Sequence, residues 1–213
     1  MRVSSGKGYA QLYGVRNFRA VLNGVYYRGG ANNIYFQPSR ENSNPLPTAG
    51  LRNLCEEGFG RAVYLYSTRY ESAPRTLKCR DYKGSENTIE YLQISPLHFR
   101  ANDLKQLLTL IHQHIRDPRR GPIYDHCWNG WHASGFVAAT TLRQFCGFTG
   151  EQAVAYWNMG TDGNNKGAHY DEIRSRIRAF RPLPELTLTP AEKASLCPAP
   201  GTFQFRGPGK KSN

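Results

Sequence analysis

The chain of 213 residues is 39% hydrophobic, enough to bury one sizeable core, so we expect a single folded domain. It has no apolar run of about 18 residues, and its first twenty residues contain no continuous apolar segment. The sequence therefore predicts neither a membrane span nor a signal peptide. We expect a cytoplasmic protein, or an exported one if a signal segment has been removed.

The net charge of +12 arises from 28 Lys and Arg against 16 Asp and Glu. A charge of this size is typical of proteins that bind nucleic acid, but its distribution does not favour nucleic acid as the main partner. Seven of the charges lie at the two ends, at Arg2, Lys7, Arg16, Arg19, Arg206, Lys210 and Lys211. The rest of the chain fits a domain that binds a phosphorylated or otherwise anionic substrate. The sequence does not indicate the oligomeric state.

Strand and helix patterns alternate along the chain after a basic extension at residues 1–20. They predict helices and β-strands in this order: helix Pro47–Glu57, strands Ala62–Tyr66 and Thr88–Ile94, helix Leu104–Arg116, strand Gly121–Tyr124, and helices Gly135–Cys146 and Tyr170–Phe180. Such alternation is typical of an α/β fold, with a central, mostly parallel sheet of four to five strands flanked by helices. Residues 181–213 are interpreted as a C-terminal strap or a partly ordered tail.

The five cysteines show no paired spacing of the kind that binds zinc, and we expect no metal and no other cofactor. Cys55 and Cys146 lie in apolar helical patterns and are interpreted as small buried hydrophobic residues. Cys79 and Cys197 lie in polar contexts. A disulfide between these two would fit an exported protein, although the sequence does not establish that they are close.

The segment from His126 to Gly135 is the part of the chain best suited to chemistry. Cys127 falls where a buried strand passes into a helix, and such a junction collects backbone N–H groups and the positive end of the helix dipole. That field stabilises both an oxyanion and a thiolate, which makes a cysteine there nucleophilic. The alternative is an inert cysteine at the end of a core strand.

This segment resembles the signature loop of cysteine-dependent tyrosine and dual-specificity phosphatases, and we call it the signature loop. Five residues match the family's pattern in register: His126, Cys127, Gly130, Ser134 and Gly135. The preceding segment Val25–Gly30 is similar to the opening segment of small phosphatases of this type. The resemblance covers about residues 21–180 and implies a phosphatase-like domain.

The resemblance implies a role for each matched residue. Cys127 would be the nucleophile, and His126 would orient the loop. Ser134 would donate a hydrogen bond to the sulfur as the phosphate leaves, or would simply cap the following helix. Phosphate would be held by loop residues Trp128, Asn129, Gly130, Trp131, His132 and Ala133. We expect one of the two indoles to contact the ligand and the other to pack.

Ala133 stands where the family has the arginine that grips two phosphate oxygens. Two residues are candidates for replacing that positive charge. His132 would be charged below about pH 6.5. Arg28 either reaches the anion directly or satisfies backbone carbonyls beneath the loop.

The family's general acid is usually an aspartate about thirty residues before the nucleophile, and this stretch has none. His98 is the candidate there. The nearest carboxylate, Asp103, is interpreted as complementing a helix dipole. Further along, the Gly- and Asn-rich segment 157–167 predicts either a turn or a pocket rim with Asp162 or Asn165 touching the ligand.

Three functions are compatible with this pattern. The first is an atypical phosphatase that hydrolyses a phosphoester through the Cys127 thiolate. The second is a pseudophosphatase that binds an anionic ligand with little or no turnover. The third is a thiolate enzyme of another class, such as acyl transfer, for which the arginine is unnecessary.

Overall fold

The computed structural model describes residues 15–31, 45–97 and 101–198. His98 lies outside these ranges. The strands are β1 (Arg16–Leu22), β2 (Tyr26–Gly30), β3 (Arg61–Tyr64), β4 (Thr76–Arg80), β5 (Glu86–Gln93) and β6 (Ile123–Cys127). The helices are α1 (Thr48–Glu56), α2 (Ala101–Arg116), α3 (Ala133–Cys146), α4 (Gly150–Met159), α5 (His169–Ala179) and α6 (Pro190–Leu196), with a 3-10 turn at Pro118–Arg120.

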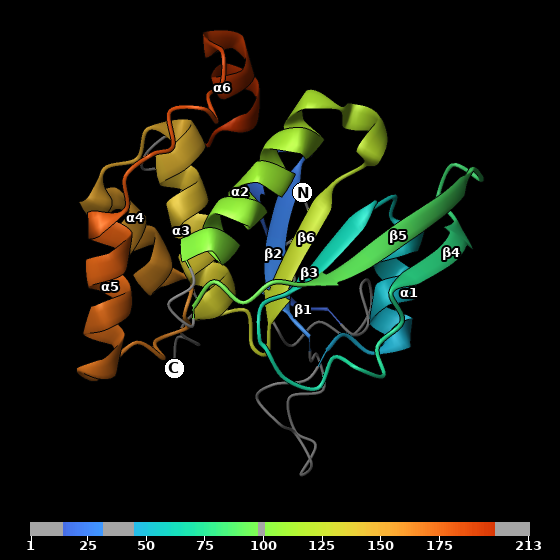
Figure 1. Ribbon diagram of the computed structural model, residues 1–213, viewed down its shortest axis with the longest axis horizontal. Helices are drawn as coiled ribbons and strands as arrows, with labels where there is room; N and C mark the ends of the chain where they lie inside the picture. Colours follow the sequence, from blue (N-terminus) through green and yellow to red (C-terminus); the bar gives the residue numbers. More distant parts are fainter. Residues whose placement is uncertain (1–14, 32–44, 98–100, 199–213) are drawn as a thin grey trace, which may run out of the picture.

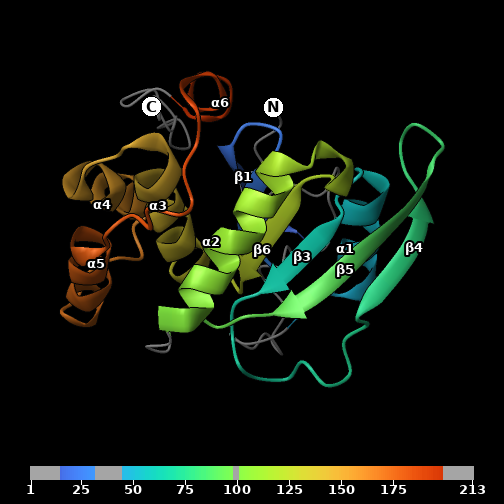
Figure 2. The same cartoon turned by 45° about the horizontal axis from the view of Figure 1, so that its top comes forward.

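The strands form one sheet in the order β1-β2-β6-β3-β5-β4. The four central strands β2, β6, β3 and β5 run parallel to one another, whereas the edge strands β1 and β4 pair antiparallel with β2 and β5. Helix α1 covers one face, while α2 and the α3 to α5 group cover the other (Figures 1 and 2). The expectation of a mostly parallel α/β sheet flanked by helices is confirmed.

The sheet has six strands rather than the expected four to five. The three strand ranges expected from the sequence correspond to β3, β5 and β6, whereas β1, β2 and β4 lie outside the repeating strand and helix pattern on which the prediction depended. The expected boundary between the basic extension and the domain, at residues 20 and 21, falls inside β1. Within the described ranges, no helix combines the length and apolar character that crossing a membrane requires.

Strand β6 is the centre of the fold, and all five of its residues are buried. Successive side chains point to opposite faces of a strand, so Ile123, Asp125 and Cys127 share the face toward α3, while Tyr124 and His126 face the α1 layer. A strand covered on both faces in this way must be apolar throughout or carry polar groups that are satisfied internally. The buried polar residues of β6 are therefore structural or functional features.

The cysteines pair differently from the expectation. Disulfides join Cys55 to Cys79 and Cys146 to Cys197, leaving Cys127 as the free cysteine of the described residues. The interpretation of Cys55 and Cys146 as unpaired and the pairing of Cys79 with Cys197 are therefore wrong. The reason is topological, since β4 packs on α1 and the segment after α6 returns to the end of α3. Neither contact is visible in the local sequence.

The two disulfides are expected to contribute much of the stability. Closing loops of this size with a disulfide typically stabilises a protein by about 2–4 kcal/mol. We expect reduction with dithiothreitol to lower the Tm, measured by circular dichroism, by roughly 10 °C or more. Mass spectrometry after alkylation in denaturant without reductant should find one labelled cysteine, in the Cys127 peptide. Labelling of all five cysteines would contradict the pairing.

Candidate active site

The nucleophile candidate occupies the strand-to-helix junction that the sequence predicts. Cys127 is the last residue of β6, and α3 begins six residues later at Ala133. The Cys127 side chain is a free thiol, and the residue is 2% exposed. Its Sγ lies 3.4 Å from Oγ of Ser134 in the first turn of α3. The sulfur and a hydroxyl thus meet at the positive end of a helix, which favours negative charge on either a thiolate or a bound oxyanion.

A cavity of about 230 Å³ opens over Cys127. Its lining is rich in aromatic rings and comprises Tyr66, Cys127, Trp128, Asn129, Trp131, His132, Asn164 and Tyr170. Both tryptophans line it, and Trp128 also packs into the core on the α1 side of the sheet, where it is 6% exposed. The cavity is therefore large enough for a phosphate group together with part of the molecule that carries it.

Polar side chains outside the cavity hold the carbonyl groups of the signature loop. Nη1 of Arg28 donates to the Gly130 carbonyl at 2.6 Å, and Nδ2 of Asn17 donates to the same oxygen at 3.1 Å. Nε1 of Trp157 donates to the His132 carbonyl at 3.2 Å. The C=O and N–H of a trans peptide point in opposite directions. Each carbonyl held outward therefore turns the N–H of the next residue the other way, which is the arrangement an anion-binding loop requires.

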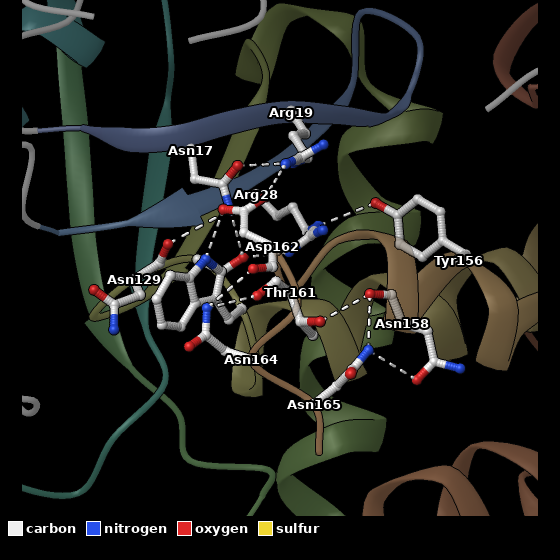
Figure 3. A network of polar contacts seen from close by, with 12 residues as sticks. Asn17, Arg19, Arg28, Asn129, Tyr156, Asn158, Thr161, Asp162, Asn164 and Asn165 are labelled. Carbon is white, nitrogen blue, oxygen red and sulfur yellow. Dashed lines mark hydrogen bonds and ion pairs between the residues drawn. The ribbon is translucent and has the colours of Figure 1, made fainter. Parts of the chain in front are cut away.

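Figure 3 shows Asn17 on β1 and Arg28 on β2 pointing to the signature loop, with Arg19 beside them against Asn17 and Asp162. Asn17 adopts a left-handed conformation, with φ of 51°, at a register shift in β1, and Nε of Arg19 donates to its Oδ1 at 2.8 Å. Asparagine tolerates this conformation better than most residues. Gly130 also has a positive φ, 75°, which lets the loop turn against β2.

Arg28 lies behind the signature loop and is fully buried. Besides Gly130, its Nε donates to the Tyr156 hydroxyl at 3.0 Å. Arg28 is not among the residues that line the cavity. Of its two predicted placements, the structure has the one beneath the loop, against backbone carbonyls.

His126 is fully buried on the opposite face of the sheet from Cys127. Its ring lies beside tyrosine rings, with centroid distances of 5.2 Å to Tyr64 and 5.8 Å to Tyr91. Nδ1 lies 3.1 Å from the Cys127 carbonyl and Nε2 lies 2.8 Å from the Tyr91 hydroxyl. A carbonyl only accepts, so Nδ1 carries the proton and Nε2 accepts from Tyr91. His126 thereby fixes the backbone of the nucleophile.

Burial lowers the pKa of His126 to about 3, so the ring is neutral in the folded protein at neutral pH. In the unfolded chain the His126 ring takes up a proton below about pH 6.5, whereas in the folded protein it does so only near pH 3. The folded protein therefore loses stability as the pH falls from 6.5 toward 3. We expect thermal unfolding to show a decline of up to about 1.4 kcal/mol per pH unit from this residue. His126→Gln should be less stable at pH 7 but decline less steeply between pH 6.5 and 4. A parallel decline in the two proteins would contradict this assignment.

His132 lines the cavity but is held by its surroundings. Nε2 lies 2.7 Å from the Asn164 carbonyl, and the ring stacks on Tyr170 with centroids 4.5 Å apart. Burial is the main cause that lowers the pKa of His132 below its usual value. The lowered pKa disfavours a positive charge on His132 as a replacement for the missing arginine.

The segment between α4 and α5 lies against the signature loop. Oδ2 of Asp162 accepts from Nε1 of Trp131 at 2.9 Å, and its half-exposed carboxylate also pairs with Arg19. Asn164 lines the cavity, whereas the side chain of Asn165 donates to the Asn158 carbonyl at 3.1 Å. Asp162 thus contacts the Trp131 side chain of the signature loop without lining the cavity, and the residue of this segment that does line it is Asn164 rather than Asn165.

The general-acid candidate His98 lies outside the described residues. The nearby Asp103 lies in the first turn of α2, where Oδ2 accepts from the Ser95 backbone N–H at 3.3 Å. This is the structural role that the sequence indicated for it. Several residues of the site come from separate elements and were not among the sequence-based candidates: Asn17, Tyr66, Tyr91, Tyr156, Trp157, Asn164 and Tyr170. Of these, Trp157 and Asn164 belong to the segment 157–167 that the sequence indicated as a turn or pocket rim.

Comparison with known proteins finds the fold and no closer relative. No family model matches the chain, and no curated protein matches it. The core catalytic domain of the PP-IP phosphatase SIW14 from S. cerevisiae, solved with citrate, is similar at 15% identity with a TM-score of 0.50, over 78% of this chain and 86% of that chain. A second structure of the Siw14 catalytic core gives 14% identity and a TM-score of 0.51, over 81% of this chain and 89% of that one.

A structure of PTPMT1 is also similar, at 15% identity and a TM-score of 0.48, over 76% of this chain and 96% of that chain. At this level of identity the comparisons address the fold. The chain has the α/β fold of the dual-specificity phosphatases.

Proposed function

We propose that the protein is an atypical cysteine-dependent phosphatase that hydrolyses a phosphoester through the Cys127 thiolate. The observation that carries the proposal is the position of the Cys127 sulfur beneath the cavity, 3.4 Å from the Ser134 hydroxyl at the start of α3. The outward-held carbonyls of Gly130 and His132 support it, because they leave the adjoining amides for the phosphate oxygens.

The proposed reaction has two steps. The Cys127 thiolate attacks phosphorus, an S–P bond forms, and the P–O ester bond breaks as the leaving oxygen takes up a proton. Water then attacks phosphorus and gives a proton back to the group that protonated the leaving oxygen, and the S–P bond breaks to release phosphate and regenerate the thiolate. Ser134 donates a hydrogen bond to the departing sulfur. The proton donor in the first step remains the sequence-based candidate His98.

Ala133 favours a second function, anion binding with little turnover. Loss of one charge-assisted donor to a developing anion typically costs about 10²–10³ in rate. An enzyme that lacks the arginine of the signature loop is therefore expected to be slow. The aromatic lining of the cavity supports binding of a group that is attached to the anion in either case.

Trapping the cysteinyl-phosphate intermediate distinguishes the two functions. The protein should be mixed with a ³²P-labelled aryl phosphate, quenched in acid and digested. Label on the peptide that contains Cys127, together with release of inorganic phosphate, would establish the phosphatase. Tungstate binding, measured by tryptophan fluorescence, with no label and no released phosphate would establish the binding protein. If the protein showed no tungstate binding and no label, both functions would be overturned.

The disulfides bear on where the protein acts. Stable disulfides form in oxidising compartments and are rare in the cytosol. The pairs Cys55–Cys79 and Cys146–Cys197 therefore support an exported protein over a cytoplasmic one.

A further inference from the structure

Arg28 lies in a niche that is built around its guanidinium group. The residue is on β2, where it is the register partner of Asp125 on β6, and it is fully buried. Its Nη1 donates to the Gly130 carbonyl of the signature loop at 2.6 Å, and its Nε donates to the Tyr156 hydroxyl at 3.0 Å. The guanidinium thus bridges the loop and α4 (Figure 3).

Space for the guanidinium comes from the glycine that ends the neighbouring helix α4. A Cβ at Gly160 would lie 2.1 Å from Nη2, closer than any side chain could tolerate. A Cβ at Gly135, in the first turn of α3, would lie 3.5 Å from Nη1, an ordinary contact distance. Gly160 has φ of −78°, an ordinary value for any residue, so it is the space rather than the backbone conformation that requires glycine there.

Hydrogen bonding alone does not account for an arginine at this position. Nη2 is buried and has no hydrogen-bond partner among the described residues. Supporting one loop carbonyl needs only one donor, which a neutral amide side chain supplies. Burying the entire cation is unfavourable unless its charge interacts favourably with an opposite charge or with hydrogen-bonding groups. The niche therefore retains a positive charge in addition to a hydrogen bond.

Asp125, the register partner of Arg28, offsets this charge only in part. Oδ2 of Asp125 accepts from the Tyr26 hydroxyl at 2.5 Å, and Oδ1 has no hydrogen-bond partner among the described residues. Burial raises the pKa of Asp125 well above its usual value, which disfavours its negative charge. The guanidinium itself contacts the loop rather than this carboxyl group.

We infer that Arg28 is a positioning residue that supplies from behind the signature loop the positive charge that Ala133 does not provide. The charge acts through the Gly130–Trp131 peptide. The guanidinium polarises the Gly130 carbonyl, and the N–H on the opposite side of the same peptide plane becomes a stronger donor toward the cavity. A desolvated charge also acts through the low-dielectric interior on an anion bound at the loop. This inference rests on the proposed anion-binding function.

Charge and hydrogen bonding are separated by a matched pair of variants. Arg28→Lys keeps a charge and a donor, whereas Arg28→Gln keeps a donor without charge. Tungstate affinity should be measured by calorimetry at fixed ionic strength, with the Tm of each variant measured in parallel. We expect Arg28→Gln to weaken binding about 10- to 100-fold and Arg28→Lys to remain within about 5-fold of the wild type.

A third variant addresses the niche without changing residue 28. Gly160→Ala displaces Nη2, and we expect it to weaken tungstate binding about 3- to 10-fold. Gly160→Ala also tests the inference if Arg28→Gln does not fold. Affinity of Arg28→Gln equal to that of the wild type, equal losses in the Gln and Lys variants, or wild-type affinity in Gly160→Ala would each overturn the inference. A wild type that binds no tungstate would overturn the proposed function itself, and with it the inference.

Discussion

Replacing Cys127 with serine is expected to lower phosphoester hydrolysis by at least about 10⁴-fold, since the sulfur is the proposed attacking atom and a hydroxyl at neutral pH is a far weaker nucleophile. The site should otherwise survive, because the loop carbonyls are held by Asn17, Arg28 and Trp157 rather than by the thiol. We expect tungstate affinity within about 5-fold of the wild type. Single-turnover kinetics and calorimetry on the same preparation measure both quantities.

Ser134→Ala is the matched control for this experiment. The hydroxyl is proposed to act on the departing sulfur, so its loss should slow the second step and let the phosphorylated protein accumulate. We expect about a 10- to 100-fold lower steady-state rate with an intact first turnover. Hydrolysis by Cys127→Ser at the wild-type rate would remove the thiol from the mechanism.

Replacing Ala133 with arginine is expected to raise turnover by about 10²–10³-fold, because it restores a charged bidentate donor at the transition state. Ala133 is fully buried at the start of α3 and does not itself line the cavity, so the new side chain has to pass its packed neighbours to reach the cavity over Cys127. The kcat/KM for an aryl phosphate and the Tm should be measured together, since added volume in a packed region also costs stability.

Ala133→Met is the control, because it adds a side chain of comparable reach without charge. Equal rates in the Arg and Met variants would show that charge at position 133 is not the missing component. The double variant Arg28→Gln with Ala133→Arg connects this test to the buried charge behind the loop. If the two arginines supply the same field, the second substitution should recover most of the tungstate affinity that the first one loses.

Much of the fold follows from local pattern. The helix expected at Pro47–Glu57 is α1, Thr48–Glu56, and the helix expected at Gly135–Cys146 is α3, Ala133–Cys146. The apolar residues in these segments recur with the spacing of a helix, which is a local property. The edge strands β1 and β4 were not predicted, because an edge strand is defined by what it pairs with and only weakly by its own residues.

The disulfide pairing, like the edge strands, depends on contacts between segments that are distant in the sequence. The sequence separates Cys146 from Cys197 by 51 positions, and only the return of the chain over α2 and α3 brings the two together. Several polar contacts hold this returning segment, including the hydrogen bond from Arg116 to the Thr187 carbonyl. A spacing in the sequence contains no information about such a path.

The amino-acid sequence by itself determined where the candidate chemistry lies, since a cysteine between a buried strand and a glycine-bearing helix start is a contiguous pattern whose field arises from the backbone around it. Tertiary structure decided what supports that loop. Asn17, Arg28, Trp157 and Asn164 come from four separate segments and contact the loop only after the sheet has formed and α4 has packed beside it. Arg28 makes the distinction clear: its charge is evident in the sequence, but its position behind the loop depends on the pairing of β2 with β6 and on the space left by Gly160.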